Sequence, residues 1–405
     1  MLTVEEALEQ ILSRVKPLPA ERVPLMDALG RALAEPIVSG REIPPWANSS
    51  MDGYAVRASD TARVPVKLVV VGTVTAGAVP SRAVGAGEAI RIFTGAPLPP
   101  GADAVIPQED TDAVDGHVTL NASVSVGAYV RPRGEDLRVG ETVLTPGAAL
   151  GPAEIGLLAT LGHAQVRVHR RPRVAILSTG NELAELGREP GPGQIPNTNS
   201  YSLFAQVLEA GAEPINLGIA GDHLDSIAER LRWGGGADVL LSSAGVSVGD
   251  LDLVKTALRR AGAELHLWQV SMRPGKPITF GSLAGHAVFG LPGNPVSAMV
   301  TFELFVRPAL RRLSGFGAIH RVRLRARALA PIPNPGFRRG YLRVTLDRVA
   351  GGGGWGARLT GDQGSAILTS MVRADGLAVV QGDTTVAAGD EVEVIVFRGL
   401  AVQDV

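Results

Sequence analysis

Residues suited to binding a phosphate or a metal ion gather in loops that directly follow strand-like apolar runs. In the loop LSTGNEL (177–183), Thr179 and Gly180 can present a hydroxyl and an amide to a phosphate, and Glu182 can ligate a hard cation. The segment PNTNSY (196–201) then opens a helix, where an asparagine could also serve simply as the N-cap. These residue types favour a phosphate or cation site at the end of a strand.

A second loop, 241–255, runs from a strand into a helix and is rich in small residues. Small residues let the backbone approach an oxyanion, and a helix N-terminus favours negative charge. Asp250 and Asp252 could bind Mg²⁺ there, although aspartate is also a common N-cap. The loop has neither the GxxxxGK(S/T) nor the GxGxxG pattern, which counts against a nucleotide-processing hydrolase. Its candidate phosphate-binding residues are Ser242, Ser243, Gly245, Ser247 and Gly249.

Two rigid turns follow. In SMRPGKPITFG (271–281), Arg273 and Lys276 flank a Pro-Gly turn, and Lys276 is one of only four lysines. A solvated turn is the ordinary explanation, but two cations near a candidate phosphate loop favour a role in binding. In GLPGNPVS (290–297), Pro292 and Pro295 enclose Asn294 and fix the backbone, so this turn can act as a pre-formed wall.

Three loops in the N-terminal half are more ambiguous. Asp52 lies in NSSMDGYAV (48–56), where an ordinary Asp-Gly turn is the simplest interpretation. Thr94, between two strand-like runs, could offer its hydroxyl to an anion or belong to a plain β connection. Arg131 and Asp136 lie in a charge cluster that is either solvated or an arginine gripping a phosphate beside a carboxylate.

Composition excludes several classes of protein. The 405 residues contain no cysteine, so disulfides, thiolate zinc sites and cysteine nucleophiles are excluded. The net charge of −1 argues against a nucleic-acid binder, and no apolar run reaches a membrane span of about 18 residues. The acidic, amphipathic N-terminus is unlike a signal peptide, so a cytoplasmic protein is expected.

The elements that must position these loops follow from hydrophobic spacing. Helices are predicted at 3–15 and 152–162, short β runs between 43 and 145, and alternating strands and helices from 173 to 312. The predicted fold is α/β with accessory β domains, built on a central three-layer α/β domain with a largely parallel sheet. The expected domains are a helical/linker domain (1–45 with 146–170), a mostly β domain (46–145), an α/β domain (171–315) and a small C-terminal β domain (321–405).

Parallel sheets bind ligands beyond the carboxyl ends of their strands, which is where the unusual loops lie. The residues alone therefore indicate a soluble protein that binds Mg²⁺ and a phosphate-bearing substrate.

The motifs taken together are more specific. Their ordered set resembles the MoeA-type family of molybdopterin molybdenumtransferases, related to the E domain of gephyrin. The resemblance implies that molybdate is inserted into adenylylated molybdopterin, with Mg²⁺ assisting cleavage of the phosphoanhydride and AMP released. It also implies a homodimer, and it makes the molybdopterin adenylyltransferase a candidate partner. The motifs that carry it are NSSMDGYAV, TGAPLPPGADAVIPQE, RPRGED, LSTGNEL, PNTNS, GDH, SSAGVSVGD, MRPGKP and GLPGNPVS.

By the same resemblance, two groups of residues match functional positions of the family. Asp52, Thr94, Arg131 and Asp136 lie in its β domain. The α/β-domain group comprises Glu182, Asp222, Asp252, Arg273 and Lys276, with Glu182, Asp222 and Asp252 as the expected metal ligands and Pro292 and Pro295 in its Pro-Gly-Asn-Pro loop. The resemblance implies that the two groups meet across a two-fold interface.

The chain departs from the family at three positions. Gln269 and Arg273 stand where lysines are common, and Ala244 where glycine is frequent. An arginine binds an oxyanion as a planar fork and not as a point charge, so the geometry of molybdate binding is expected to differ. A non-catalytic pterin-binding or scaffolding relative and a tungstate-preferring enzyme are the alternative interpretations.

Overall fold

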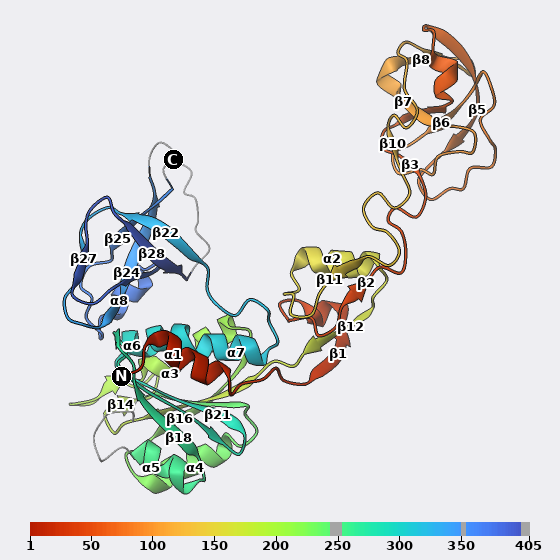
Figure 1. Cartoon of the computed structure of the whole chain (residues 1–405). Coiled ribbons are helices and arrows are strands. Elements are labelled where there is room, and N and C mark those ends of the chain that lie inside the picture. The colour runs from red at the N-terminus through yellow and green to blue at the C-terminus, as the bar shows by residue number, and fades with distance from the viewer. Residues whose placement is uncertain (244–252, 350–353, 398–405) are drawn as a thin grey trace. The chain divides into compact units, whose positions relative to one another are not determined.

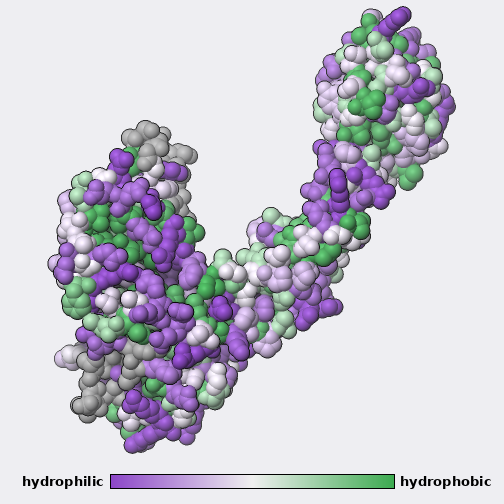
Figure 2. Space-filling model, viewed as in Figure 1, coloured by the Kyte–Doolittle hydropathy of each residue, from purple (hydrophilic) through white to green (hydrophobic). Residues whose placement is uncertain are grey.

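The computed structural model describes residues 1–243, 253–349 and 354–397, which fold as two compact units. The inserted unit consists of Pro36–Thr145 and Leu157–His163. The main unit consists of Met1–Glu35, Pro146–Gly156 and the chain from Ala164 onward. Among the described residues, no helix is both long and apolar enough to cross a membrane. Figure 2 shows hydrophilic and hydrophobic residues interspersed over the visible face.

The inserted unit is built on one six-stranded sheet, with short paired strands outside it. Successive residues along its strands pack alternately into two apolar clusters, one on each face of the sheet. Tyr54 and Val56 pack in one cluster and Ala55 in the other. The sheet order is β7 (Ala104–Pro107), β4 (Gly53–Val56), β6 (Glu88–Ile92), β5 (Val66–Val74), β9 (His117–Leu120) and β8 (Thr111–Val114). The short pairs are β2 (Ile37–Val38) with β11 (Thr142–Leu144) and β3 (Asn48–Ser49) with β10 (Val130–Arg131).

The main unit contains the predicted α/β core. Four adjacent strands are parallel: helices return the chain from β13 to β16 and from β16 to β17, and β21 is reached from β20 by an antiparallel hairpin. Strands β20 and β18, which pair antiparallel with each other, complete the far side. The sheet is therefore mixed at one edge, where the strand that follows the predicted Pro-Gly turn was not expected. Its order is β16 (Glu213–Ala220), β13 (Arg173–Thr179), β17 (Val239–Ser243), β21 (His286–Leu291), β20 (Pro277–Leu283) and β18 (Glu264–Gln269).

Helices cover both faces of this sheet, which confirms the three-layer fold (Figure 1). Along β13, Val174 and Ile176 enter one apolar cluster while Ala175 and Leu177 enter the other. The first face carries α1 (Val4–Leu12), α3 (Thr198–Glu209), α6 (Pro295–Thr301) and α7 (Arg307–Leu313); the second carries α4 (Leu224–Trp233) and α5 (Leu253–Arg260).

The helix expected at 295–312 is interrupted. A π-helical turn, Phe302–Val306, separates α6 from α7. Pro308 lies at the start of α7 and has no N–H to donate to the preceding turn, so the wider turn accommodates it.

The C-terminal part of the main unit is a small closed barrel. Its strands are β24 (Arg339–Arg348), β25 (Trp355–Leu359), β22 (Arg323–Ala328), β28 (Glu391–Val396) and β26 (Gly376–Val380), and β26 pairs back with β24. One further strand, β19 (Met272–Arg273), comes from the chain between β18 and β20 of the α/β domain and joins the barrel beside β24. The smaller elements are β23 (Ile332–Asn334), β27 (Thr384–Val386) and α8 (Leu368–Val372).

The remaining elements connect these parts. Strands β1 (Ala20–Pro24) and β12 (Gln165–His169) form an antiparallel pair in the main unit. Helix α2 (Pro152–Thr160) carries the chain between the two units. Short strands β14 (Leu183–Ala184) and β15 (Ile195–Pro196) form a parallel pair beside the candidate site.

Candidate functional site

The carboxyl ends of three parallel strands lie side by side. Ser178 of β13 is in register with Ser243 of β17, and Ser243 is in register with Leu291 of β21. The loops that follow these strands therefore start from one edge of the sheet, as sequence analysis expected. Thr179, Ser242 and Ser243 are all buried at this edge.

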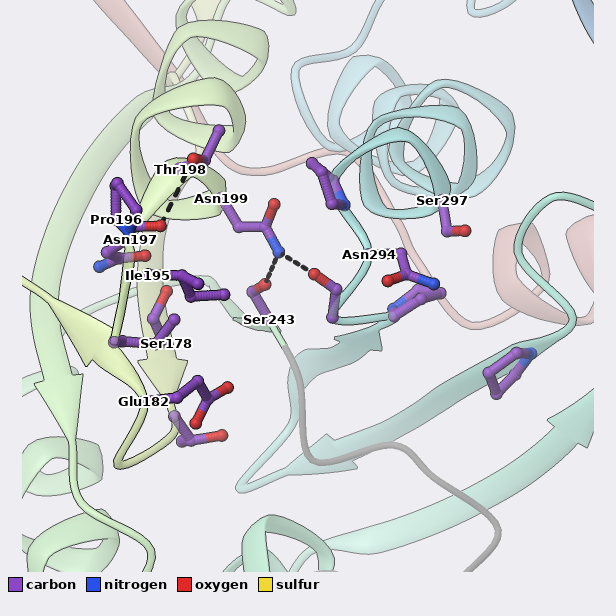
Figure 3. Close-up of a pocket in the computed structure, with 16 residues that line it drawn as sticks. Ser178, Glu182, Ile195, Pro196, Asn197, Thr198, Asn199, Ser243, Asn294 and Ser297 are labelled. Carbon is purple, nitrogen blue, oxygen red and sulfur yellow. Dashed lines mark hydrogen bonds between the residues drawn. The ribbon is translucent and has the colours of Figure 1, made fainter. Parts of the chain in front are cut away.

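The first loop depends on Gly180. Its φ of +148° is a conformation that essentially only glycine adopts, and a Cβ built there would lie 2.4 Å from Glu182 Oε2. Any larger residue would displace the carboxylate. Glu182 itself is exposed and lies at the candidate pocket (Figure 3).

Asn199 joins three of the loops. Its Nδ2 donates to Ser243 Oγ at 2.7 Å and to the backbone oxygen of Gly293 at 2.7 Å, as Figure 3 shows. Its Oδ1 is buried and has no hydrogen-bond partner among the described residues. The neighbouring Asn197 is the N-cap of α3 and accepts from the Ser200 amide. Of the two asparagines, Asn197 thus has the structural role and Asn199 holds the walls of the site together.

These loops enclose a pocket of about 620 Å³ in the main unit. Hydroxyl and amide side chains dominate its polar lining, and Ser297 at the start of α6 is 4% exposed. The described residues that line it are Ser178, Thr179, Glu182, Leu183, Ile195, Pro196, Asn197, Thr198, Asn199, Ser243, Pro277, Pro292, Gly293, Asn294, Pro295 and Ser297.

Asp222 lies in the loop after β16, next to the β13 loop. The amide of Asn181 donates to Asp222 Oδ2 at 3.2 Å, and the amide of Asp222 donates to Asn181 Oδ1 at 3.1 Å. This reciprocal pair ties together the loops that carry Glu182 and Asp222. Asp222 is not among the described residues that line the pocket.

The basic turn is anchored to the barrel. Met272 and Arg273 pair with Arg339 and Gly340 of β24, and one Nη of Arg273 donates to the Pro335 carbonyl at 3.2 Å. Lys276 is partly buried and directly precedes the pocket residue Pro277. Among the described lining residues there is no lysine or arginine. The two cations precede β20, whose first residues lie beside the carboxyl end of β21, so they lie at the same edge of the sheet as the pocket.

In the inserted unit, the structure brings Asp52 and Thr94 together. Both the amide and the hydroxyl of Thr94 donate to Asp52 Oδ1 at 2.8 Å. These two bonds, the amide first, lower the pKa of Asp52 below its ordinary value. The carboxylate therefore bonds the Thr94 loop and not its own turn. The next residue, Gly53, permits the close pairing of β4 with β7, because a Cβ there would lie 1.9 Å from the Ile106 carbonyl oxygen.

The other two predicted residues of this unit lie on connections nearby in the chain. Arg131 of β10 pairs with Asn48 of β3, and β3 continues into the Asp52 turn. The amide of Asp136 donates to the Ile43 carbonyl at 2.9 Å. Arg131 forms no ion pair with a described residue; the ion pair of this cluster joins Arg133 to Glu42.

Several predictions lie outside the described residues: Ala244, Gly245, Ser247, Gly249, Asp250 and Asp252. The three-carboxylate metal site therefore stays a prediction. Within the described part of the chain, no cluster of three histidine or acidic residues is arranged to hold a metal ion.

Sequence reasoning missed part of the pocket. Ser297, Pro277 and Ile195 line it without having been named as candidates. The GLPGNPVS motif contains Ser297, and its place in the first turn of a helix beside a rigid loop was a usable signal. Nothing local marks Ile195, which reaches the pocket through the β14–β15 pairing.

Comparison with known families matches three consecutive segments of the chain. Residues 2–162 match "MoeA N-terminal region (domain I and II)", residues 175–312 match "Probable molybdopterin binding domain", and residues 325–397 match "MoeA C-terminal region (domain IV)".

Similar proteins extend over nearly the full length. The chain is 39% identical to the "Molybdopterin molybdenumtransferase" of Nostoc sp., over 93% of this chain and 88% of the relative. It is 35% identical to the enzyme of the same name from Haemophilus influenzae, over 99% of this chain and 100% of the relative. A crystal structure of a MoeA protein from Pyrococcus horikoshii is 32% identical with a TM-score of 0.85, covering 98% of this chain and 100% of that one.

Proposed function

Because this chain belongs to the MoeA family of molybdopterin molybdenumtransferases, enzymes of molybdenum cofactor biosynthesis, we propose that it inserts molybdate into adenylylated molybdopterin and releases AMP. The substrates are the adenylylated pterin and the molybdate oxyanion. In the course of the reaction water cleaves the phosphoanhydride bond, so that AMP leaves and the other phosphate stays on the pterin.

The observation that carries this proposal is the pocket at the carboxyl edge of the sheet. Its volume of about 620 Å³ falls within the range of about 300–1,000 Å³ typical of small-molecule sites. Serine, threonine and asparagine side chains can orient a polar pterin and its phosphate without charge, and the cations Arg273 and Lys276 flank the same edge. This combination suits a substrate that is anionic at one end.

The chain's own residues have separable tasks in this proposal. Asn199 and Ser243 hold the walls and present polar atoms to the pterin, and Pro292 and Pro295 keep one wall rigid. Lys276 attracts the oxyanion. Arg273 has one Nη committed to the Pro335 carbonyl, so its other donors are the ones available to molybdate.

The oxygen-only donor set fits Mg²⁺. Glu182 lies at the pocket and Asp222 lies in the loop tied to it, and magnesium prefers carboxylate and water oxygens. Glu182, Asp222 and Asp252 would hold the ion, directly or through water. When bound, Mg²⁺ would neutralise negative charge on the phosphoanhydride oxygens.

The β-region residues Asp52, Thr94, Arg131 and Asp136 complete the proposal. By resemblance they serve the same reaction, and we propose that a second copy of the chain supplies them in a homodimer. The enzyme that adenylylates molybdopterin is the proposed upstream partner, since it makes the substrate.

Incubation with adenylylated molybdopterin, Mg²⁺ and molybdate tests the proposal. AMP release together with activation of an apo-molybdoenzyme is the expected result. A parallel reaction with tungstate measures the preference between the two oxyanions. Binding of the pterin without AMP release under saturating Mg²⁺ and molybdate would contradict the proposal and favour a scaffolding role.

A further inference from the structure

The first turn of helix α6 is capped by a residue of the barrel. Helices leave their first N–H groups without partners, and the N-cap residue normally accepts from one of them. The N-cap of α6 is Asn294, and its side chain makes no such bond. Instead the amide of Val296 donates to the Ser365 carbonyl at 3.1 Å, and Asn294 Nδ2 donates to Ser365 Oγ at 3.0 Å. A pocket wall is thus held by a loop far along the chain.

That loop, residues 361–365, is organised around Arg343 of β24. One Nη of Arg343 donates to the Gly364 carbonyl at 3.0 Å and to the Asp362 carbonyl at 3.4 Å. The backbone of Arg343 exchanges two bonds with the Gln363 side chain, at 2.8 and 3.2 Å. Its Nε donates to Ser370 Oγ at 3.0 Å. Both the side chain and the backbone of this residue therefore define the shape of the loop.

Arg343 is fully buried, and no carboxylate forms an ion pair with it among the described residues. Burial lowers the pKa of its guanidinium to about 10, so it remains charged at neutral pH. Burying an arginine is costly when its charge is unpaired. The side-chain hydrogen bonds of Arg343 go to the loop and to Ser370, and its other Nη is buried without a partner among the described residues. This set of bonds indicates that holding the loop is its role.

We propose that Arg343 is a positioning residue for the pterin pocket: it fixes the loop 361–365, and through Ser365 that loop fixes Asn294 and the start of α6. The relation to catalysis rests on the proposed function, whereas the positioning itself does not. Because β24 also pairs with Met272 and Arg273, the same barrel strand supports both the loop behind Asn294 and the basic turn that precedes the pocket residue Pro277.

The substitution Arg343→Met tests the proposal. Methionine retains much of the volume, and Asp362, the carboxylate whose charge favours the guanidinium, is exposed and stays solvated when the arginine is removed. Arg348→Met is the matched control, since Arg348 lies on the same strand, is exposed and stacks on Trp355.

Hydrogen exchange gives a readout that needs no substrate. In Arg343→Met, the Val296 amide is expected to exchange at least about 10-fold faster, while the amides of β22 and β28 keep their wild-type rates. Arg348→Met should leave the Val296 rate unchanged. An unchanged Val296 rate in folded Arg343→Met overturns the proposal.

Kinetics provide the second readout. A loosened wall should raise the KM for adenylylated molybdopterin about 5- to 10-fold with kcat within about twofold, whereas loss of folded protein would lower kcat alone. Arg343→Lys should recover part of the KM, because a lysine restores the charge without the planar fork. A fall in kcat with KM unchanged, in Arg343→Met that circular dichroism shows to be fully folded, contradicts positioning.

If Arg343→Met does not fold, Gln363→Ala decides. Gln363 is partly buried. Its substitution by alanine removes only the two bonds to the Arg343 backbone and one bond within the loop, to the Gly361 carbonyl. A faster Val296 amide in this variant supports the proposal, and a wild-type rate overturns it. Absence of AMP release by the wild-type enzyme would refute the proposed function separately, because the exchange experiment is independent of turnover.

Discussion

Asn199 offers the sharpest test of the pocket. Its Nδ2 bonds both Ser243 and Gly293, so truncation to alanine removes the link between two walls. Each hydrogen bond contributes about 0.5–1.5 kcal/mol net, so the two together are worth about 1–3 kcal/mol. The buried Oδ1 has no partner among the described residues, and its removal recovers part of that amount. A net loss of about 1–2 kcal/mol in pocket organisation is therefore expected.

The effect of Asn199→Ala on the pocket is best measured as a change in the affinity for the pterin, not as a change in the free energy of unfolding. The chain folds as two compact units, so its denaturation is not expected to be a single two-state transition. Calorimetric titration with adenylylated molybdopterin should show an affinity about 5- to 30-fold lower in Asn199→Ala, the equivalent of about 1–2 kcal/mol. Asn199→Asp should lower the affinity further than Asn199→Ala, because a carboxylate oxygen would face the Gly293 carbonyl oxygen.

Asn121→Ala is the matched control. Asn121 also donates through its side-chain amide, to Asp112 at 2.7 Å, but it lies exposed in the inserted unit. This variant should bind as the wild type does. Wild-type affinity in both Asn199 variants would refute the inference that Asn199 holds the walls of the pocket.

Three further predictions concern the charged residues. Asp222→Asn should cut AMP release by at least about 10²-fold and leave binding of free molybdopterin nearly unchanged, as expected when a metal ion that neutralises charge is misplaced; unaltered turnover at saturating Mg²⁺ would exclude Asp222 from the metal site. Thr94→Val should raise the pKa of Asp52 part of the way to its ordinary value, because the Thr94 amide bond remains; a carboxyl NMR titration measures this. The direction of the pH dependence of stability follows from this shift. Because the pKa of Asp52 is lower in the folded than in the unfolded chain, its contribution to stability is present above the unfolded pKa and is lost as the pH falls through the folded pKa. Mixing inactive Asp52→Ala and Asp222→Ala chains under subunit exchange should restore up to about a quarter of wild-type activity, and no recovery with exchange verified by mass spectrometry would place each site within one chain.

Local patterns predicted much of the fold. The run at 173–178 is β13, and the helix at 3–15 appears as α1 with the Thr3–Glu6 capping box intact. Strands β16, β18 and β20 were not predicted, because β propensity depends strongly on neighbouring strands that the sequence does not reveal. The Pro-Gly turn between Arg273 and Lys276 is present, whereas the strands on either side of it, β19 and β20, were not predicted, because two different sheets supply their partners.

The site was predictable to a similar degree. Loops at strand ends could be identified, since parallel strands bring their carboxyl ends together whatever the loop sequence. The contacts between those loops could not. Asn199 meets Ser243 and Gly293 at separations of 44 and 94 residues, and Asn294 meets Ser365 at a separation of 71. Such pairings follow from tertiary packing and leave no mark on local spacing.

The discontinuity of the main unit has a consequence for synthesis on the ribosome. Helix α1 buries Val4, Ala7 and Ile11 in a cluster with residues from Val174 to Leu313 and beyond. At a translation rate of about 5–20 residues per second, these partners are synthesised roughly 10–60 s after α1, and its apolar residues stay unburied during that time. The inserted unit, whose sheet comes entirely from Gly53–Leu120, has its strands available much earlier. The nascent chain thus carries a β unit whose strands are complete and, nearer the N-terminus, the segment of α1 with its apolar residues still unburied, too short to be a stable helix alone. Exposed hydrophobic surface of this kind is what chaperones bind.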